Sequence, residues 1–425
     1  MIGFAGLSHL GLNYSLATAA QGFDVVAYDP DPAATARLRE GIFPIEEPGF
    51  QELWRQHRHR LRYTSDLAEL GACDLVFYAL DVRTNERNES DSGPLRGLIE
   101  GTLGALSAQA TAVLLSQVSP GTTRAWTAAW SGRPEIKVRS FYYQVETLIF
   151  GAAVQRALEP ERYMVGAADP SQPLPAALRA WHAAFGCPVL VMRYESAELA
   201  KIAINFFLVS TVTTTNTLAE VCEAIGADWS EIAPALRLDR RIGPHAYLQP
   251  GLGIAGGNLE RDLVTVLGLA EQHGTEAGVV RAWQQNSAYR RDWALRAVHR
   301  EVLGRAASPA LAIWGIAYKR DTHSIKNSPS IELMRALPGL PIRVHDPVAR
   351  FDPGALPHAS LVGDPLDALR GADALVIMTP WQAYGGIAPA EIKGRLRGRL
   401  VLDPHGVLDP AACRAAGLDQ RRLGC

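Results

Sequence analysis

Short apolar runs and longer amphipathic stretches alternate along the first 193 residues. The strands predicted there are Ile2–Ala5, Phe23–Tyr28, Leu75–Leu80 and Ala112–Ser116. Each run has the length and composition of a buried strand, and helix-like stretches separate the runs. Because strands that alternate with helices pair in parallel, this region is predicted to form a doubly wound α/β sheet.

The same alternation returns in the last third of the chain. The strands predicted there are Ala310–Ile316, Ile342–His345, Ala374–Met378 and Leu400–Leu402. Between the two regions a helical pattern runs from Ser196 to Ile225 with apolar residues on several faces, as a subunit interface would have. The predicted fold class is α/β, with two Rossmann-like doubly wound parallel-sheet domains joined by a long central helical region. The predicted domains are 1–193, 194–304 and 305–425.

Composition limits the classes of function. A chain of 425 residues is too long for one core, and its net charge of -2 gives no general attraction to nucleic acid or to an anionic membrane. The sequence opens without a basic leader, and no apolar run reaches the roughly 18 residues of a membrane span, so a cytoplasmic location is expected. The five cysteines lack CxxC or CxxH spacing, so neither a disulfide framework nor a zinc site is expected.

A glycine turn follows the first predicted strand. The segment Gly6-Leu-Ser-His-Leu-Gly11 opens a helix that runs to Ala20, and the next strand ends in Asp29. In dinucleotide-binding turns the glycines allow the tight turn, the helix N-terminus binds the pyrophosphate, and the acid binds the ribose. A carboxylate at Asp29 favours NAD over NADP because it repels a 2′-phosphate. Ser8 replaces the middle glycine, so this segment alone fits a simple strand-to-helix turn equally well.

Three further segments offer ligand sites. Asp81–Gly93 and Ser116–Thr123 are polar and follow strands at the predicted carboxyl edge of the first sheet, where ligands of such sheets bind. The second of them also fits a turn that caps the next helix. In the last region, Lys319 follows a strand and precedes a helix that begins near Ser328, which offers another phosphate-sized site.

The segment Pro250–Asp262 contains four glycines and ends in polar side chains, so its backbone is suited to close approach by a ligand. On the predicted long helix, Lys201 and Asn205 are four residues apart and therefore share one face. An ammonium and a carboxamide directed at one atom would stabilise an alkoxide or oxyanion. A solvated lysine beside a structural asparagine is the alternative.

These segments together resemble the UDP-glucose/GDP-mannose 6-dehydrogenases over almost the whole chain. The matching segments are Gly6–Gly11, Gly41–Gly49, Ser116–Thr122, Glu195–Asn205, Asp239–Gly243, Pro250–Asp262, Gly315–Thr322, Ser328–Pro329 and Thr379–Trp381. The resemblance implies an N-terminal NAD domain, a helical middle that forms a homodimer, and a C-terminal domain that binds the nucleotide sugar. It also implies oxidation of a sugar C6 alcohol to an acid in two NAD-dependent steps, through a thioester on a cysteine.

The resemblance assigns roles to individual residues. Those expected at the catalytic centre are Lys201, Asn205, Asp262, Asn258 and Glu146. Those expected to bind NAD are Gly6, Ser8, His9, Leu10, Gly11, Asp29 and Gln117. Those expected to bind the nucleotide sugar are Thr147, Leu148, Arg241, Tyr247, Gly253, Gly256, Lys319 and Lys326.

The departures from the family pattern fall mainly on one half of the reaction. Asn258 stands where the family has its nucleophilic cysteine, Gln117 replaces a threonine that orients water, and Phe150 replaces a second glutamate. An asparagine carboxamide is no nucleophile, so no thioester can form there. Lys201, Asn205 and Asp262 match the family and would serve the first oxidation, as alkoxide stabilisers and as a proton acceptor through water.

Other departures concern the ligands. A family Thr-Pro that would contact NAD is not recognisable near Asp81 and Val82. Lys326 stands in place of an arginine, and since the two are not equivalent at a bidentate contact, the nucleotide can differ from UDP. The family's late Asp-Gly-Arg pattern reads Asp403-Pro-His405.

The primary hypothesis is NAD-dependent oxidation of the C6 alcohol of a nucleotide sugar or related nucleoside-linked alcohol that stops at the aldehyde. Transient oxidation followed by epimerisation or elimination is a variant, and either would suit a specialised sugar or antibiotic pathway. Full oxidation without a thioester and a catalytically silent regulatory partner remain the alternatives.

Overall fold

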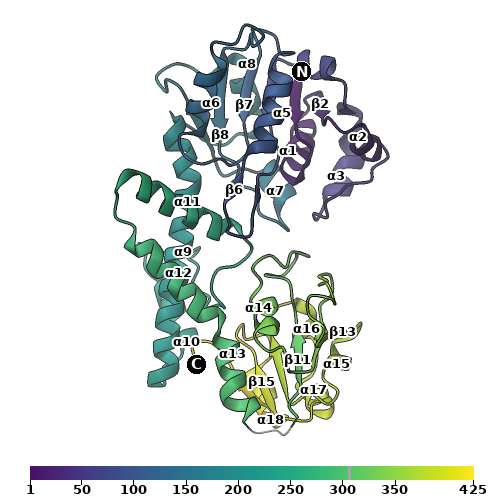
Figure 1. The fold of residues 1–425 in the computed structure, drawn as a ribbon, viewed down its shortest axis with the longest axis vertical. Coiled ribbons are helices and arrows are strands. Elements are labelled where there is room, and N and C mark those ends of the chain that lie inside the picture. The colour runs from purple at the N-terminus through teal and green to yellow at the C-terminus, as the bar shows by residue number, and fades with distance from the viewer. Residues whose placement is uncertain (305–307) are drawn as a thin grey trace. The chain divides into compact units, whose positions relative to one another are not determined.

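The computed structural model describes residues 1–304 and 308–425. The predicted start of the third domain at residue 305 lies outside the described residues. The chain divides into two compact units, Met1–Ile204 and Asn205–Cys425, here called the N-terminal and C-terminal units (Figure 1). The three-domain division stays a prediction.

The N-terminal unit is built on an eight-stranded sheet in the order β10-β9-β8-β7-β4-β1-β2-β3. Its strands are β1 (Ile2–Ala5), β2 (Val25–Tyr28), β3 (Leu61–Thr64), β4 (Leu75–Tyr78), β7 (Thr111–Leu114), β8 (Ser140–Gln144), β9 (Tyr163–Ala167) and β10 (Val189–Arg193). A short hairpin of β5 (Arg83–Thr84) and β6 (Ser90–Asp91) lies outside this sheet.

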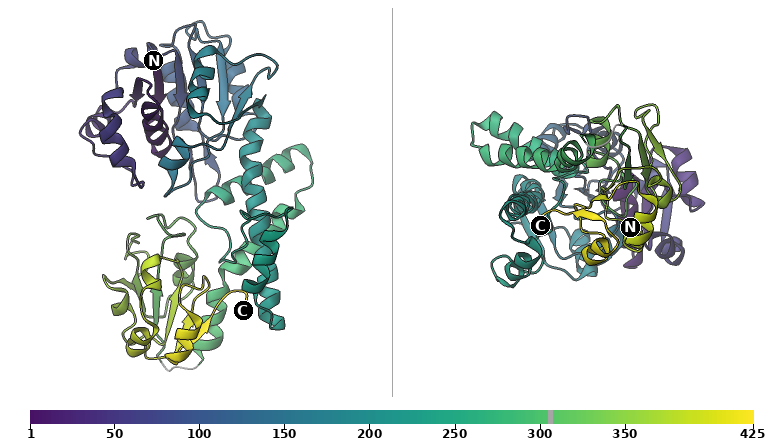
Figure 2. Two further views of the ribbon diagram at one scale, coloured as in Figure 1. Left: turned by 180° about the vertical axis from the view of Figure 1, so that it is seen from behind. Right: turned by 90° about the horizontal axis from the view of Figure 1, so that it is seen from below.

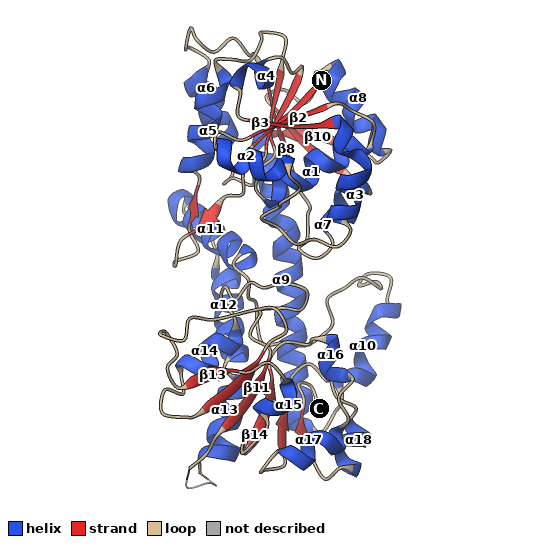
Figure 3. Ribbon diagram, turned by 90° about the vertical axis from the view of Figure 1, so that its right-hand side faces the viewer, coloured by secondary structure: helices blue, strands red, loops and turns tan. Residues whose placement is uncertain are grey.

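Helices cover both faces of this sheet (Figure 3). They are α1 (His9–Ala20), α2 (Pro32–Arg39), α3 (Phe50–His57), α4 (Leu67–Gly71), α5 (Gly93–Leu103), α6 (Thr122–Trp130), α7 (Ala153–Leu158) and α8 (Ala176–Phe185), with a 3₁₀ turn η1 (Arg58–Arg60). Successive residues of a strand point to opposite faces, so Phe77 belongs to one core while its neighbours Val76 and Tyr78 belong to the other. Two buried faces require strands that are apolar throughout, as the sequence pattern predicted.

One strand pair departs from the predicted parallel sheet. All pairs in the sheet are parallel except β8 with β9, which are antiparallel. Strand β9 therefore starts at the edge where β8 ends, and the connection between them need not cross the sheet. This keeps residues 145–162 at the carboxyl edge, where a doubly wound sheet binds its ligands.

The longest helix is α9 (Tyr194–Ile225), which begins in the N-terminal unit and ends in the C-terminal unit (Figure 2). The other elements of the C-terminal unit before its sheet are α10 (Trp229–Leu238), α11 (Asn258–His273), α12 (Gly278–Arg291), α13 (Trp293–Val298) and a π-helical turn η2 (His299–Leu303). Among the described residues, α9 is the one helix long and apolar enough to cross a membrane. Of its most apolar 18-residue stretch, 33% is buried within the protein. This corrects the expectation that no apolar stretch of the chain reaches the length of a membrane span.

A second, fully parallel sheet completes the C-terminal unit, in the order β13-β12-β11-β14-β15-β16. Its strands are β11 (Leu311–Trp314), β12 (Ile342–His345), β13 (Ala359–Leu361), β14 (Ala374–Ile377), β15 (Leu400–Leu402) and β16 (Asp419–Arg421). Its helices are α14 (Pro329–Arg335), α15 (Pro365–Ala368), α16 (Gln382–Gly385), α17 (Pro389–Arg395) and α18 (Pro410–Ala415). The predicted fold class, with two Rossmann-like sheets and a long helical region in the chain between them, is confirmed.

A buried carboxylate organises the carboxyl edge of this second sheet. Asp346 directly follows β12 and is only 2% exposed. It accepts five hydrogen bonds, from the backbone amides of Ile316, Ala317, Val348 and Ala349 and from Nε1 of Trp381. The loops that follow β11, β12 and β14 are therefore tied to one side chain, which the sequence analysis did not single out.

Candidate active site

The first glycine turn has the close packing that a dinucleotide-binding turn needs. Gly6 has a φ of +94°, in the left-handed region that favours glycine. A Cβ on Gly11 would lie 1.9 Å from the carbonyl oxygen of Gly6, so α1 can approach the turn only because Gly11 has no side chain. The predicted glycine positions therefore have a specific structural cause.

Asp29 lies beside this turn. Its Oδ2 accepts a hydrogen bond from the Leu7 amide at 3.3 Å, and its Oδ1 accepts one from the Asp31 amide at 3.0 Å. The carboxylate is thus held at the end of β2, next to the loop that leads into α1. That is where a Rossmann acid binds a ribose.

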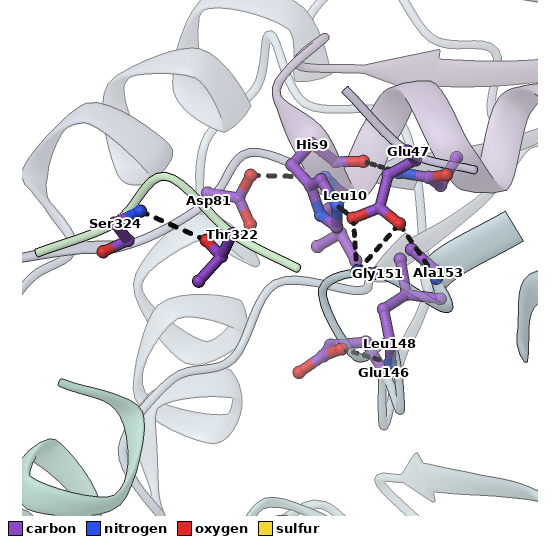
Figure 4. Close-up of polar contacts among 11 residues, drawn as sticks. His9, Leu10, Glu47, Asp81, Glu146, Leu148, Gly151, Ala153, Thr322 and Ser324 are labelled. Atoms are coloured by element: carbon purple, nitrogen blue, oxygen red, sulfur yellow. Dashed lines mark hydrogen bonds and ion pairs between the residues drawn. The ribbon is translucent and has the colours of Figure 1, made fainter. Parts of the chain in front are cut away.

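Ser8 and Asp81 connect the turn to the end of β4. The Ser8 hydroxyl accepts a hydrogen bond from the Asp81 amide at 2.8 Å and donates one to the Ala79 carbonyl at 3.3 Å. The Asp81 carboxylate accepts a hydrogen bond from the Leu10 amide at 3.2 Å (Figure 4). A carboxylate therefore interacts with the first turn of α1.

Glu47 connects three segments of the N-terminal unit. Its buried carboxylate lies 2.7 Å from Nε2 of His9 and accepts hydrogen bonds from the amides of Gly151 and Ala153 (Figure 4). The His9 ring also lies against Phe150, with ring centroids 4.3 Å apart. Glu47 was not predicted as a contact of this region, although it lies within the Gly41–Gly49 segment that carries the family resemblance.

Glu146 and Lys201 form an ion pair in the N-terminal unit. The Lys201 Nζ lies 2.6 Å from Oε1 of Glu146 and donates to its backbone carbonyl at 3.0 Å, and both side chains are about four-fifths buried or more, at 13% and 15% exposed. The other carboxylate oxygen of Glu146 accepts from the Leu148 amide. Nearby, the Thr147 carbonyl accepts from Nε of Arg156. The expected catalytic lysine is therefore held by an expected catalytic glutamate.

The loop that contains Gln117 is held by Glu198 of α9. The Glu198 carboxylate accepts hydrogen bonds from the amides of Gly121 at 2.6 Å and Thr123 at 2.8 Å, at the start of α6. Burial raises the pKa of Glu198, because desolvation penalises the charged form more than these bonds favour it. The loop therefore does not cap α6 with a side chain of its own, although one interpretation of the sequence expected such a cap. The N-cap residue is Gly121, and the carboxylate comes from Glu198, which was not predicted as a contact.

The glycine-rich loop before α11 is tightly packed within the C-terminal unit. Gly253 and Gly256 have φ values of +79° and +97°. A Cβ on Gly253 would lie 2.5 Å from the Ser287 carbonyl oxygen, and one on Gly256 would lie 2.4 Å from the Tyr318 ring. Burial raises the pKa of Tyr318 to about 12. Both glycines are therefore needed for the path of the loop itself.

The polar residues that follow this loop are arranged on α11. Asn258 is the first residue of the helix and is exposed. Asp262 is 1% exposed and accepts hydrogen bonds from Nδ2 of Asn205 at 2.5 Å and from Nε of Arg261 at 3.0 Å. Lys201 and Asn205, which were predicted to act on one atom, thus each contact a different carboxylate.

The remaining expected substrate residues have varied environments. Lys326 accepts a hydrogen bond from Gly256 through its carbonyl, and its aliphatic chain packs beside Gly257. The Lys319 ammonium lies 5.8 Å from the centre of the Tyr318 ring. Arg241 pairs with Asp239 at the surface, and Tyr247 is 49% exposed. Within residues 1–304 and 308–425, no contact of Arg241 or Tyr247 assigns either of them a ligand.

The residues of the N-terminal unit fit NAD. The turn at Gly6, the close approach at Gly11 and the carboxylate of Asp29 supply the backbone and the acid that a dinucleotide needs. Asp29 also disfavours the 2′-phosphate of NADP. The Asp81 carboxylate is the one feature of the turn described above that does not favour a pyrophosphate.

Comparison with known proteins agrees with this geometry. Three models of the UDP-glucose/GDP-mannose dehydrogenase family match the chain in order. The NAD binding domain matches residues 1–185, the central domain 195–288 and the UDP binding domain 312–410. The chain belongs to this family.

Individual relatives match over nearly the full chain. The UDP-glucose 6-dehydrogenase of Pseudomonas aeruginosa is 30% identical and covers 99% of this chain and 96% of its own length. The putative UDP-glucose 6-dehydrogenase YtcA of Bacillus subtilis is 28% identical and covers 97% of each chain. The structure of a UDP-glucose dehydrogenase from Pyrobaculum islandicum superimposes with a TM-score of 0.85 at 26% identity, over 97% of each chain.

Family membership establishes the type of enzyme. The chain is an NAD-dependent dehydrogenase of the nucleotide-sugar dehydrogenase family, which acts on a CH–OH group. The sequence prediction of family, cofactor and enzyme class is confirmed. The roles of individual site residues stay predictions.

Proposed function

We propose that this enzyme oxidises the C6 alcohol of a nucleotide sugar with NAD and releases the aldehyde. The observation that carries the proposal is Asn258, which occupies the first position of α11 after the glycine-rich loop. This is where the family resemblance places the nucleophilic cysteine, and a carboxamide cannot form a thioester. Without covalent capture, the second oxidation lacks its intermediate.

The first oxidation keeps its expected groups. NAD, held by the turn at Gly6 and Gly11 and by the Asp29 carboxylate, would supply the acceptor for the hydride that leaves C6. The Lys201 ammonium and the Asn205 carboxamide would stabilise the developing alkoxide, because both are polarised donors held by buried partners. Asp262 would accept the alcohol proton through a water, and its hydrogen bonds from Asn205 and Arg261 fix its orientation.

The hydrolytic half lacks its expected groups. The second glutamate of the family motif is Phe150, whose ring contacts His9. The water-orienting threonine is replaced by Gln117. These two residues and Asn258 all affect the step that would turn an aldehyde into an acid, which supports an aldehyde product.

The product ratio tests this proposal directly. Purified enzyme is incubated with NAD and a limiting nucleotide sugar, starting with UDP-glucose, and NADH is measured by absorbance while the sugar is followed by mass spectrometry. We expect one NADH per sugar consumed and an aldehyde that hydrazine traps. Two NADH per sugar with a uronic acid product would overturn the aldehyde proposal, and turnover of sugar without net NADH would instead indicate transient oxidation.

An Asn258→Cys variant tests how much of the second step is lost. We expect a product that is still predominantly aldehyde, because Gln117 and Phe150 remain unsuited to hydrolysis. An Asn258→Ser variant is the matched control, since serine is close to cysteine in size but its hydroxyl is a weaker nucleophile than a thiol. Robust uronic acid formation by Asn258→Cys alone would show that the hydrolytic groups are present elsewhere.

We also propose a homodimer that forms through α9, in the cytoplasm. Phe207 and Ile225 on this helix are 77% and 71% exposed, which is unusual for large apolar side chains. A Phe207→Asp variant is expected to shift the molar mass from dimer to monomer in light scattering after size exclusion, while Glu271→Gln at an exposed position on α11 should not. A monomeric parent enzyme would contradict this proposal.

A further inference from the structure

An internal anion interacts with the first turn of α1. The Asp81 carboxylate accepts the Leu10 amide at 3.2 Å, and this amide belongs to the first turn of a 12-residue helix. Ser8 is the N-cap residue of α1, but its own side chain makes no capping hydrogen bond. Asp81 therefore takes the place of a local cap.

The same position attracts the pyrophosphate of a dinucleotide. The unpaired amides and the dipole at a helix N-terminus favour a negative charge, and in a Rossmann turn that charge is the pyrophosphate. The turn itself is suited to NAD, as Gly6, Gly11 and Asp29 show. Two negative groups at one helix end repel each other, so the Asp81 carboxylate and the pyrophosphate compete for the N-terminus of α1.

We propose that Asp81 is an internal competitor of the NAD pyrophosphate and sets the affinity of the enzyme for its cofactor. This inference rests on the use of NAD under the proposed function. When the cofactor binds, the carboxylate gives up the Leu10 amide. Asp81 is exposed and follows the end of β4, so it can turn to solvent without opening the core.

Ser8 is the positioning residue for this contact. Its hydroxyl accepts the Asp81 amide at 2.8 Å while it donates to the Ala79 carbonyl at 3.3 Å. These two bonds fix the backbone of residues 79–81 against the glycine turn, which brings the carboxylate to the Leu10 amide. A glycine at position 8 would offer neither bond.

The contact also has a consequence for selectivity among nucleotides. A ligand that contains a pyrophosphate must displace Asp81 from the α1 N-terminus. Adenosine has no phosphate, so it does not compete with Asp81 for this position. Removal of the Asp81 charge should therefore strengthen the binding of ligands that contain a pyrophosphate and leave the binding of adenosine unchanged. This difference separates electrostatic competition from a general change in the pocket.

The test measures binding to the full-length protein by isothermal titration calorimetry, with ADP-ribose, NADH and adenosine as probes. For Asp81→Asn, which keeps an acceptor of the same size but loses the charge, we expect roughly ten-fold tighter binding of ADP-ribose and NADH. Adenosine affinity should not change. Asp91→Asn, in the same loop with its carboxylate on the Gly93 amide, is the matched control and should bind all three probes as the parent does.

A second variant keeps the test independent of the folding of the first. Ser8→Gly releases residues 79–81 and is expected to tighten ADP-ribose binding about three-fold, with the gain absent when Asp81 is already Asn. Equal or weaker ADP-ribose binding by Asp81→Asn, or an equal gain for adenosine, would overturn the proposal. If no variant and no parent protein bound NADH at all, the proposed function itself would fail.

Discussion

A Lys201→Met variant is expected to reduce NAD about 10²–10³-fold more slowly than the parent enzyme with saturating nucleotide sugar. The Lys201 ammonium is the expected electrostatic partner of the alkoxide formed as hydride leaves. It is preorganised by Glu146, 2.6 Å away, and by the Glu146 carbonyl. Donors that are fixed in a partly buried site act on the transition state without reorganisation, which is why the loss is large.

The measurement separates this effect from a change in binding. Initial rates give kcat and KM, and calorimetry gives the affinity for NADH, which should stay within about two-fold of the parent because the lysine lies outside the glycine turn. Lys393→Met is the matched control, since Lys393 donates only to the Gly398 carbonyl among the bonds described for its Nζ. A fall of kcat by less than about ten-fold for Lys201→Met would show that the alkoxide is stabilised by another group.

An Asp346→Ala variant is expected to lose about 3–5 kcal/mol of unfolding free energy in the C-terminal unit. Asp346 accepts five hydrogen bonds from four backbone amides and one indole. Alanine would leave these donors buried without an acceptor, and each such loss has a desolvation cost. The loops after β11, β12 and β14 would lose their common anchor.

Urea unfolding monitored by tryptophan fluorescence checks this prediction, since Trp314 and Trp381 both belong to the core of the second sheet. Asp364→Ala is the matched control, because Asp364 is exposed and caps α15 through the Leu366 amide. Loss of that cap should cost about 1 kcal/mol. Equal effects of the two substitutions would show that the Asp346 network contributes little beyond an ordinary cap.

The sequence predicted strand centres better than strand ends or edge strands. β12 and β15 have the predicted bounds, while β7 begins at Thr111 rather than Ala112. Of the strands in the two sheets, β3, β8, β9, β10, β13 and β16 were not predicted. Among these, the edge strands β3, β13 and β16 carry exposed polar residues that interrupt an apolar run. Since neither β8 nor β9 was predicted, their antiparallel pairing was missed as well. Strand direction also depends on the route of the connection, which local pattern does not specify.

The candidate site divides in a similar way. Glycines at positions 6, 11, 253 and 256 were identified from their spacing, and the structure gives each a steric cause. The contacts of Glu47 and Glu198 were not predicted, because the sequence around a single glutamate does not indicate which backbone amides will donate hydrogen bonds to it. The backbone amides that these carboxylates accept from lie more than 70 residues away, so only the folded chain brings them together.

The sequence by itself determined the α/β class, the glycine turn at residues 6–11, the family and the presence of an asparagine at position 258 after the glycine-rich loop. These features depend on local periodicity and on the identity of residues at fixed spacing, and both follow directly from the amino-acid sequence. The tertiary structure alone decided that Lys201 pairs with Glu146, that Asn205 pairs with Asp262, and that Asp81 interacts with the start of α1. Such contacts join residues distant in sequence, and their geometry follows from how the strands and helices pack.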